Sequence, residues 1–215
     1  MSERLTIGKI LGGTAALLRA HPLPALIAVV VLVAPATLFD TQPGGGQLAN
    51  LGVPIISLFA QYMVTRAVLR GENLQREPGN AGSFIGVSIV TGLAIGLGML
   101  LLIVPGLYLY ARWSIAMPLV IGEGKTMSEA MDDGGVRTAG HIVPIMLAFA
   151  AINLTWLAGF AVIWFVYPPA GPPSLPVAIA GNLLLLGALV IDWYAAVAIY
   201  KLTDEPRETL AEVFA

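Results

Sequence analysis

The pattern of apolar and polar positions divides the chain into long apolar segments with short connections that are polar or rich in proline and glycine. A helix that crosses a membrane needs about 20 apolar residues. The predicted spans cover approximately residues 23–39, 51–69, 84–104, 107–121, 142–166 and 177–200. The third and fourth are divided only by Pro105–Gly106, which we predict to be a tight turn, so this pair either crosses fully or forms a re-entrant hairpin.

Two shorter helices and a tail complete the predicted elements. Residues 4–20 combine a face of apolar side chains with basic ones, a pattern typical of an amphipathic helix on a membrane surface. A polar helix is expected over 126–140, because Thr126 and Glu129 have the spacing of a capping box. Residues 201–215 are predicted to be a charged cytoplasmic tail.

The composition agrees with a membrane protein. Of the 215 residues, 57% are hydrophobic and only 11% are charged, whereas soluble domains carry about 25% charged residues. This balance excludes a disordered chain, a coiled coil and a soluble α/β enzyme. We therefore predict one integral-membrane domain over residues 1–215, an all-α transmembrane helix bundle. Its connections are too short for a soluble catalytic domain, which needs about 50 residues.

The basic residues are segregated among the connections. All except Arg112 precede the first predicted span or lie at or beyond the ends of the second, fourth and sixth spans. The connections after the first, third and fifth spans contain no Lys or Arg. The positive-inside rule then places both termini in the cytoplasm, and we expect a multi-pass protein of a bacterial inner membrane. The net charge of −2 gives no reason to expect nucleic-acid binding.

Small residues recur along the predicted third span. Gly92 and Gly96 belong to a stripe of glycine and serine at four-residue spacing, which lets another helix approach closely. The stripe favours packing within the chain, and a homo-oligomer through the same face is the alternative. Membrane lipids are the expected partners, and the sequence identifies no protein partner.

Polar side chains within the predicted spans are the main candidates for chemistry, since charges are costly in lipid. Arg112, Asp192 and Gln61 each lie roughly 14–15 Å from the inner end of their span, at about 1.5 Å per residue. Opposite charges at equal depth predict an Arg112–Asp192 pair. This pair is either a structural lock or part of a polar cavity, and Asn153 and Thr155 are placed to extend it by hydrogen bonds between helices.

Glu123 follows the fourth predicted span. It is expected to be a solvated carboxylate at the membrane surface, with a gate or a lipid-headgroup contact as the functional alternative. The neighbouring segment Gly122–Thr126 resembles the end of a phosphate-binding loop, but Leu119 stands where that motif needs its first glycine. The chain has no cysteine and only His21 and His141 as histidines, so we expect no metal, no cofactor, no catalytic residue and no enzymatic activity.

Residues 103–131 resemble the signature of the YciC-like bacterial inner-membrane proteins, which is similar to the membrane domain that precedes some glycerophosphodiester phosphodiesterases. The matching features are Ile103 to Gly106, Arg112, Pro118, Glu123 and the Glu129–Ala130 pair. The Tyr200-Lys201-Leu202 segment resembles the family's aromatic-basic ending. The resemblance implies a six-helix inner-membrane domain and no known chemistry.

Two classes of function remain open at this point. The first is a non-enzymatic membrane protein of envelope or lipid homeostasis, acting by helix packing and lipid contact. The second is a small transporter or channel with a midplane polar site at Arg112 and Asp192. Few interrupted helices and few acidic side chains within the spans favour the first class. A hydrated cavity that reaches Asp192 would favour the second.

The predicted topology can be tested by labelling single cysteines in intact cells. Cysteines at positions 45 and 170 should react with an impermeant thiol reagent from outside, because both lie in connections without basic residues. A cysteine at position 80 should react only after the membrane is opened. Labelling of position 80 from outside would contradict the arrangement of spans.

Overall fold

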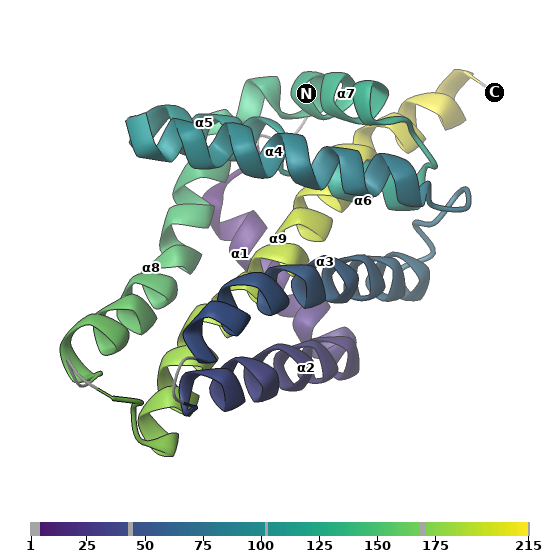
Figure 1. Ribbon diagram of the computed structural model, residues 1–215. Helices are drawn as coiled ribbons and strands as arrows, with labels where there is room; N and C mark the ends of the chain where they lie inside the picture. Colours follow the sequence, from purple (N-terminus) through teal and green to yellow (C-terminus); the bar gives the residue numbers. More distant parts are fainter. Residues whose placement is uncertain (1–4, 43–44, 102, 168–170, 215) are drawn as a thin grey trace.

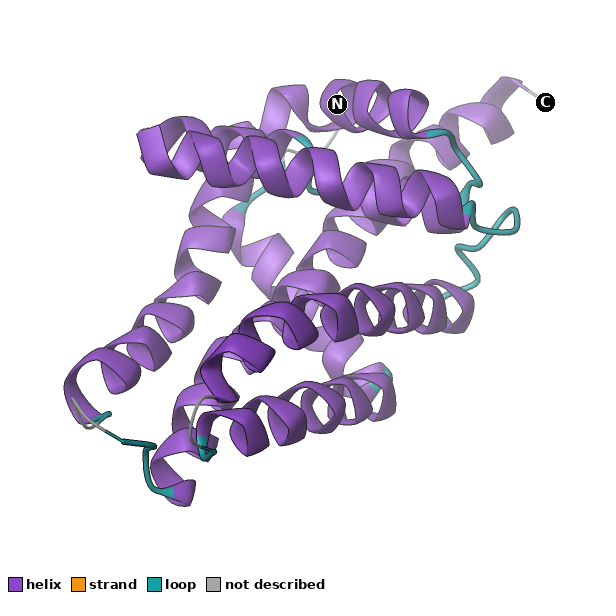
Figure 2. Ribbon diagram, viewed as in Figure 1, coloured by secondary structure: helices purple, strands orange, loops and turns teal. Residues whose placement is uncertain are grey.

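The computed structural model describes residues 5–42, 45–101, 103–167 and 171–214. Within these residues all regular secondary structure is helical (Figure 2). The helices are α1 (Ile7–Ala20), α2 (Pro22–Asp40), α3 (Gly45–Gly71), α4 (Ala81–Leu101), α5 (Ile103–Arg112), α6 (Ala116–Gly122), α7 (Met127–Thr138), a 3-10 turn η1 (Ala139–His141), α8 (Ile142–Val166) and α9 (Leu175–Phe214).

The long helices form two hairpins and an oblique pair (Figure 1). α2 packs beside α3, and α4 packs beside α5, while α9 runs obliquely behind them and packs against α8 and α2. The connections from α3 to α4 and from α6 to α7 lie at one end of the bundle, on the right in Figure 1. We call this the basic end, because Arg70, Arg76 and Lys125 lie there.

Six helical segments of the described chain are long and apolar enough to cross a membrane, which agrees with the predicted number of spans. Their outward faces expose large apolar side chains, such as Leu100 at 82% and Phe165 at 81%. Such faces are unfavourable in water but match a lipid solvent. The protein is therefore a multi-pass integral membrane protein with an all-α bundle, as the hydropathy pattern predicts.

The N-terminal helix is amphipathic in the expected way. α1 begins after Thr6, whose hydroxyl accepts a hydrogen bond from the amide of Lys9 at 3.3 Å. Its buried face carries Ile10, Thr14 and Leu17, and it packs mainly against α9. The predicted start at residue 4 lies outside the described residues. Whether α1 lies on a membrane surface stays a prediction.

The fourth predicted span differs from expectation because it is broken. α5 ends at Arg112 and α6 begins at Ala116, with a turn over residues 113–115 between them. The physical reason is Pro118, which has no amide hydrogen to bond the carbonyl of Ser114 and whose ring crowds that carbonyl. The predicted fourth span over 107–121 is therefore present within Val104–Gly122, but it is interrupted at residues 113–115.

Two predicted boundaries also differ. Pro105 and Gly106 lie in the first turn of α5 instead of forming the turn between the hairpin helices. Proline fits a first helical turn, since its missing amide hydrogen would have had no partner there. The predicted tail is a helical continuation of the last span, because α9 extends without interruption to Phe214.

The hairpin of α4 and α5 depends on a different glycine from those predicted. A Cβ added to Gly98 would lie 2.9 Å from the Cα of Gly106, so the two backbones are in close contact. By contrast, Cβ atoms added to Gly92 and Gly96 would meet nothing within 4 Å. Among the described residues, none therefore packs closely against the stripe at Gly92 and Gly96.

We predict that Gly98→Ala lowers the melting temperature in detergent, because the new methyl group would collide with backbone that cannot rotate away. Overpacking of this kind costs about 1–3 kcal/mol. Gly92→Ala is the matched control on the same helix, since its methyl group would enter open space. Equal melting temperatures for the two variants would contradict the close contact of α4 and α5.

Candidate functional site

A polar cavity of about 390 Å³ lies inside the bundle, between α3 and α4 and against α9. Its volume is within the range of about 300–1,000 Å³ that small-ligand sites occupy. The lining comes from α3, α4, α5, α6, α8, α9 and the turn between α5 and α6. Its most polar side chains are Gln61, Thr65, Ser88, Thr91, Ser114 and Asp192.

Asp192 lies at the inner wall of this cavity and is 5% exposed. The amide nitrogen Nδ2 of Asn153 lies 3.1 Å from Oδ2 and 3.4 Å from Oδ1 of the carboxylate. The hydroxyl of Tyr110 interacts with the same carboxylate. The predicted hydrogen bond between α8 and α9 through Asn153 is thus present, and Asp192 is held by neutral donors.

The predicted Arg112–Asp192 pair is not formed, so that prediction is wrong. Arg112 is exposed and donates from Nη1 to the hydroxyl of Tyr108 at 3.2 Å. Its guanidinium group packs beside Gly135 of α7, where an added Cβ would lie 3.2 Å from Nε. Two helical steps of about 100° place Tyr110 and Arg112 on opposite faces of α5. Tyr110 faces Asp192, and Arg112 therefore points away from it.

Gln61 shares the cavity with Asp192, as their equal depth predicts. It lies on α3 one turn before Thr65, which also lines the cavity. Of the three side chains expected to form one cluster, Gln61 and Asp192 border the same cavity and Arg112 does not.

Sequence reasoning missed several cavity residues, among them Tyr110, Thr91 and Ser114. The signal for Ser114 was present, because Pro118 interrupts the helix four residues after it. Non-helical backbone at membrane depth is tolerated where it lines a cavity. No sequence signal indicates that Tyr110 faces Asp192, since this depends on how α5 is rotated against α9.

Glu123 belongs to a buried cluster of charges at the basic end, so the prediction of a solvated carboxylate is wrong. Its side chain is 10% exposed and lies 2.9 Å from Arg137, itself 3% exposed. Lys125 contacts it at 2.8 Å, and the Tyr200 hydroxyl donates to it at 2.9 Å. Arg137 also pairs with Asp204, at 3.2 Å. We call these residues, with Arg76 and Asp133, the ionic cluster.

α7 positions part of this cluster, and its start is as predicted. The hydroxyl of Thr126 accepts from the amide of Glu129 at 3.4 Å, and the Glu129 carboxylate accepts from the amide of Thr126 at 3.0 Å. Both halves of the capping box are therefore present. One turn further, Gly134 packs against Ile115 and lets α7 approach the break between α5 and α6.

A partly buried carboxylate, Asp40, lies at the end of the bundle opposite the basic end. Asp40 accepts hydrogen bonds from Nδ2 of Asn182 at 2.8 Å and from the hydroxyl of Tyr167 at 3.1 Å. Asp40 therefore has the same two kinds of partner as Asp192, one amide and one phenol. Ala36, Val53 and Leu186 are among the neighbouring side chains that share its cavity.

Within the described part of the chain, no group of three His, Asp or Glu side chains is placed to hold a metal ion. Comparison with family models, with curated proteins and with solved structures finds no match to this chain. The functional argument therefore depends on the geometry of the cavity and of the ionic cluster.

The ionic cluster predicts acid sensitivity. Burial raises the pKa of Glu123, but the Lys125 hydrogen bond and the Arg137 charge lower it more, so it lies below its ordinary 4.5. A carboxylate with a lowered pKa stabilises the fold above its ordinary pKa, and this contribution is lost as the pH falls through the folded-state value. We expect Glu123→Gln to cost about 3 kcal/mol at pH 7 and to flatten the fall in melting temperature between pH 6 and 3, relative to the wild type.

The control for this measurement is Glu77→Gln, which makes the same charge change on an exposed side chain of the connection between α3 and α4. It should leave both the melting temperature at pH 7 and its pH dependence close to those of the wild type. If Glu123→Gln behaved in the same way, the ionic cluster would not contribute to stability.

Proposed function

We propose that this membrane protein is a small transporter or carrier that holds a polar ligand in the cavity at Asp192. The observation that carries the proposal is the cavity itself, a space inside the bundle whose lining includes the Asp192 carboxylate and several other polar side chains. A carboxylate at this depth is costly unless it has partners, and such groups typically mark a ligand or ion pathway. If position 192 contributed only to helix packing, an apolar side chain would suffice there.

The interruption between α5 and α6 supports the same proposal. The turn at 113–115 borders the cavity through Trp113 and Ser114. Many transporters place their substrate beside a broken helix, where unwound backbone borders the site. The proposed site consists of Asp192, Gln61 and the broken helix. Arg112, which the sequence placed in this site, lies outside it.

The protein's setting is also proposed from sequence. The segregation of basic residues supports a bacterial inner membrane with the basic end and both termini in the cytoplasm. Membership of the YciC-like family, a non-enzymatic role and a homo-oligomer through Gly92 and Gly96 are further proposals. The open space beside these two glycines is compatible with a second helix.

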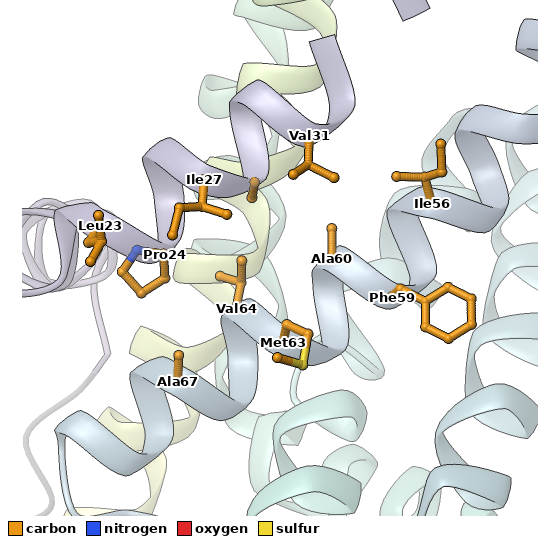
Figure 3. Close-up of a pocket in the computed structure, with 11 residues that line it drawn as sticks. Leu23, Pro24, Ile27, Val31, Ile56, Phe59, Ala60, Met63, Val64 and Ala67 are labelled. Atoms are coloured by element: carbon orange, nitrogen blue, oxygen red, sulfur yellow. The ribbon is translucent and has the colours of Figure 1, made fainter. Parts of the chain in front are cut away.

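Lipid contact is a second candidate function, favoured by an apolar groove of about 460 Å³ between α2 and α3. Figure 3 shows Ile27 and Val31 of α2 facing Ile56 and Ala60 of α3 across this groove. Its occupant would be a lipid acyl chain, because its walls are apolar. Such a groove supports envelope or lipid homeostasis by lipid contact, without transport of a solute.

The two functions differ in whether water reaches the inner cavity. A cysteine introduced by Gly92→Cys would border the cavity, and one introduced by Ile89→Cys, where the side chain is 53% exposed, would face lipid one turn away. Only thiolate reacts, and each unit of pKa increase in apolar surroundings lowers its fraction about tenfold. We expect a water-soluble thiol reagent to label position 92 at least about tenfold faster than position 89.

The natural sequence contains no cysteine, so the wild type supplies the background for this experiment. Equal labelling rates at positions 89 and 92 would mean that the cavity is dry, which would contradict a transport role and favour lipid contact.

A further inference from the structure

We infer that the cavity at Asp192 binds an ammonium group, the cationic end of a primary or quaternary amine. This inference rests on the proposed function and adds the chemical class of its ligand. Three properties of the cavity wall carry it: its charge, the direction of its hydroxyl groups and its aromatic surface.

The wall of the cavity is acidic. Asp192 is the charged side chain among the residues that line the cavity, and its described hydrogen-bond partners Asn153 and Tyr110 are neutral. A carboxylate can accept about four hydrogen bonds, so it keeps capacity for another donor. Arg112, the counter-ion predicted from the sequence, points to α7. A cationic ligand would supply the missing counter-charge, and an anionic one would be repelled.

The hydroxyl groups of the wall are oriented as acceptors. Ser88 donates its hydrogen to the carbonyl of Phe84 at 2.8 Å, and Thr91 donates to Val87 at 2.6 Å. Ser114 likewise donates to the carbonyl of Ala111 at 2.9 Å. A hydroxyl has one hydrogen and two lone pairs, so each of these groups offers lone pairs to the cavity. These hydroxyl groups therefore favour a ligand that donates hydrogen bonds or is a cation.

Aromatic rings form much of the remaining wall. Tyr110 and Phe149 lie with their centroids 4.4 Å apart, and Trp113 and Trp193 border the same space. Ring faces attract cations through their quadrupole, most strongly for tryptophan, and aromatic cages with a carboxylate are the usual recognition of ammonium ligands. A small metal cation would use the oxygen atoms but not the rings.

The cavity has an opening suited to this ligand. Gly92 and Gly96 of α4 border it, and the space where their Cβ atoms would lie is free within 4 Å. Because α3 and α4 form the outer walls, an amine could enter from lipid as the headgroup of a phospholipid or from water as a free solute. Both sources present the same ammonium chemistry, and experiment separates them.

The first measurement compares two ligands of the same shape on the wild-type protein. The protein is placed in nanodiscs of phosphatidylglycerol, which contain no amine, and titrated with choline while tryptophan fluorescence is recorded. The neutral isostere 3,3-dimethylbutanol is titrated in parallel. We expect choline to bind at least about tenfold more tightly, because only choline has the charge that Asp192 and the rings recognise.

The second measurement uses matched variants. Asp192→Asn should weaken choline binding by about tenfold or more, since it removes the charge and keeps the shape of the side chain. Asp40→Asn is the control, because Asp40 has the same amide and phenol partners but its cavity has no aromatic lining among the described residues. It should leave choline binding unchanged.

A third measurement identifies the source of the ammonium group. Nanodiscs with phosphatidylethanolamine are compared with those of phosphatidylglycerol alone, and the lipid retained by the protein is identified by native mass spectrometry. Selective retention of phosphatidylethanolamine, lost in Asp192→Asn, would support a lipid headgroup. Choline binding without such retention would support a free amine.

Two results would overturn the inference, and they are distinguishable from failure of the proposed function. Equal affinity of the wild type for choline and its neutral isostere, with no retention of the amine lipid, would exclude an ammonium site. If the cysteine at position 92 still labels rapidly, the cavity is hydrated and a ligand of another class remains to be found. If it does not label, the proposed function fails as well.

Discussion

The buried ion pairs of Arg137 are the interaction on which the arrangement at the basic end depends. Arg137 lies on α7, and its partners Glu123 and Asp204 come from the end of α6 and from α9. Arg76, in the connection between α3 and α4, pairs with Asp204 and closes the cluster. Removing one member of such a group leaves a charge without a partner in a low dielectric, so the connections and α9 are fixed together. Glu72 forms a hydrogen bond with His21 and an ion pair with Lys201, which joins the start of α2 to the end of α3 and to α9.

This anchoring explains how a broken helix persists inside the bundle. The ionic cluster holds α7 against the break between α5 and α6, where Gly134 contacts Ile115 and the hydroxyl of Thr138 donates to the carbonyl of Arg112 at 2.9 Å. That carbonyl has lost its helical partner, since α5 ends there, and it shares the Thr138 hydroxyl with the carbonyl of Gly134, at 2.8 Å. The turn at 113–115 is then stable enough to form one wall of the cavity. The charges outside the spans thus support the polar space within them.

Several polar groups in the interior of the bundle have hydrogen-bond partners within the protein. The hydroxyls of Ser88 and Thr91 bond their own helix, which removes the cost of an exposed hydroxyl hydrogen in an apolar setting. Asp192 and Asp40 each have an amide and a phenol as donors. The two carboxylates differ in what surrounds them: aromatic rings border the cavity at Asp192, and aliphatic side chains such as Val53 border Asp40. The same two kinds of donor therefore hold both carboxylates, while the side chains around the two carboxylates differ.

The sequence by itself determined the features that depend only on position along the chain, such as the length of a span, the start of a helix and the depth of a residue within its span. Apolar length set the spans, the Thr126–Glu129 spacing set the start of α7, and rise per residue placed Gln61 and Asp192 at a common depth. Rotation about each helix axis was decided only by the tertiary structure, because it depends on how neighbouring helices pack. For that reason Arg112 faces α7, and Tyr110 takes the position beside Asp192. Glu123, whose place in the sequence predicted a solvated carboxylate, is buried because the distant Arg76 and Arg137 bring their charges to it and Tyr200 donates a hydrogen bond.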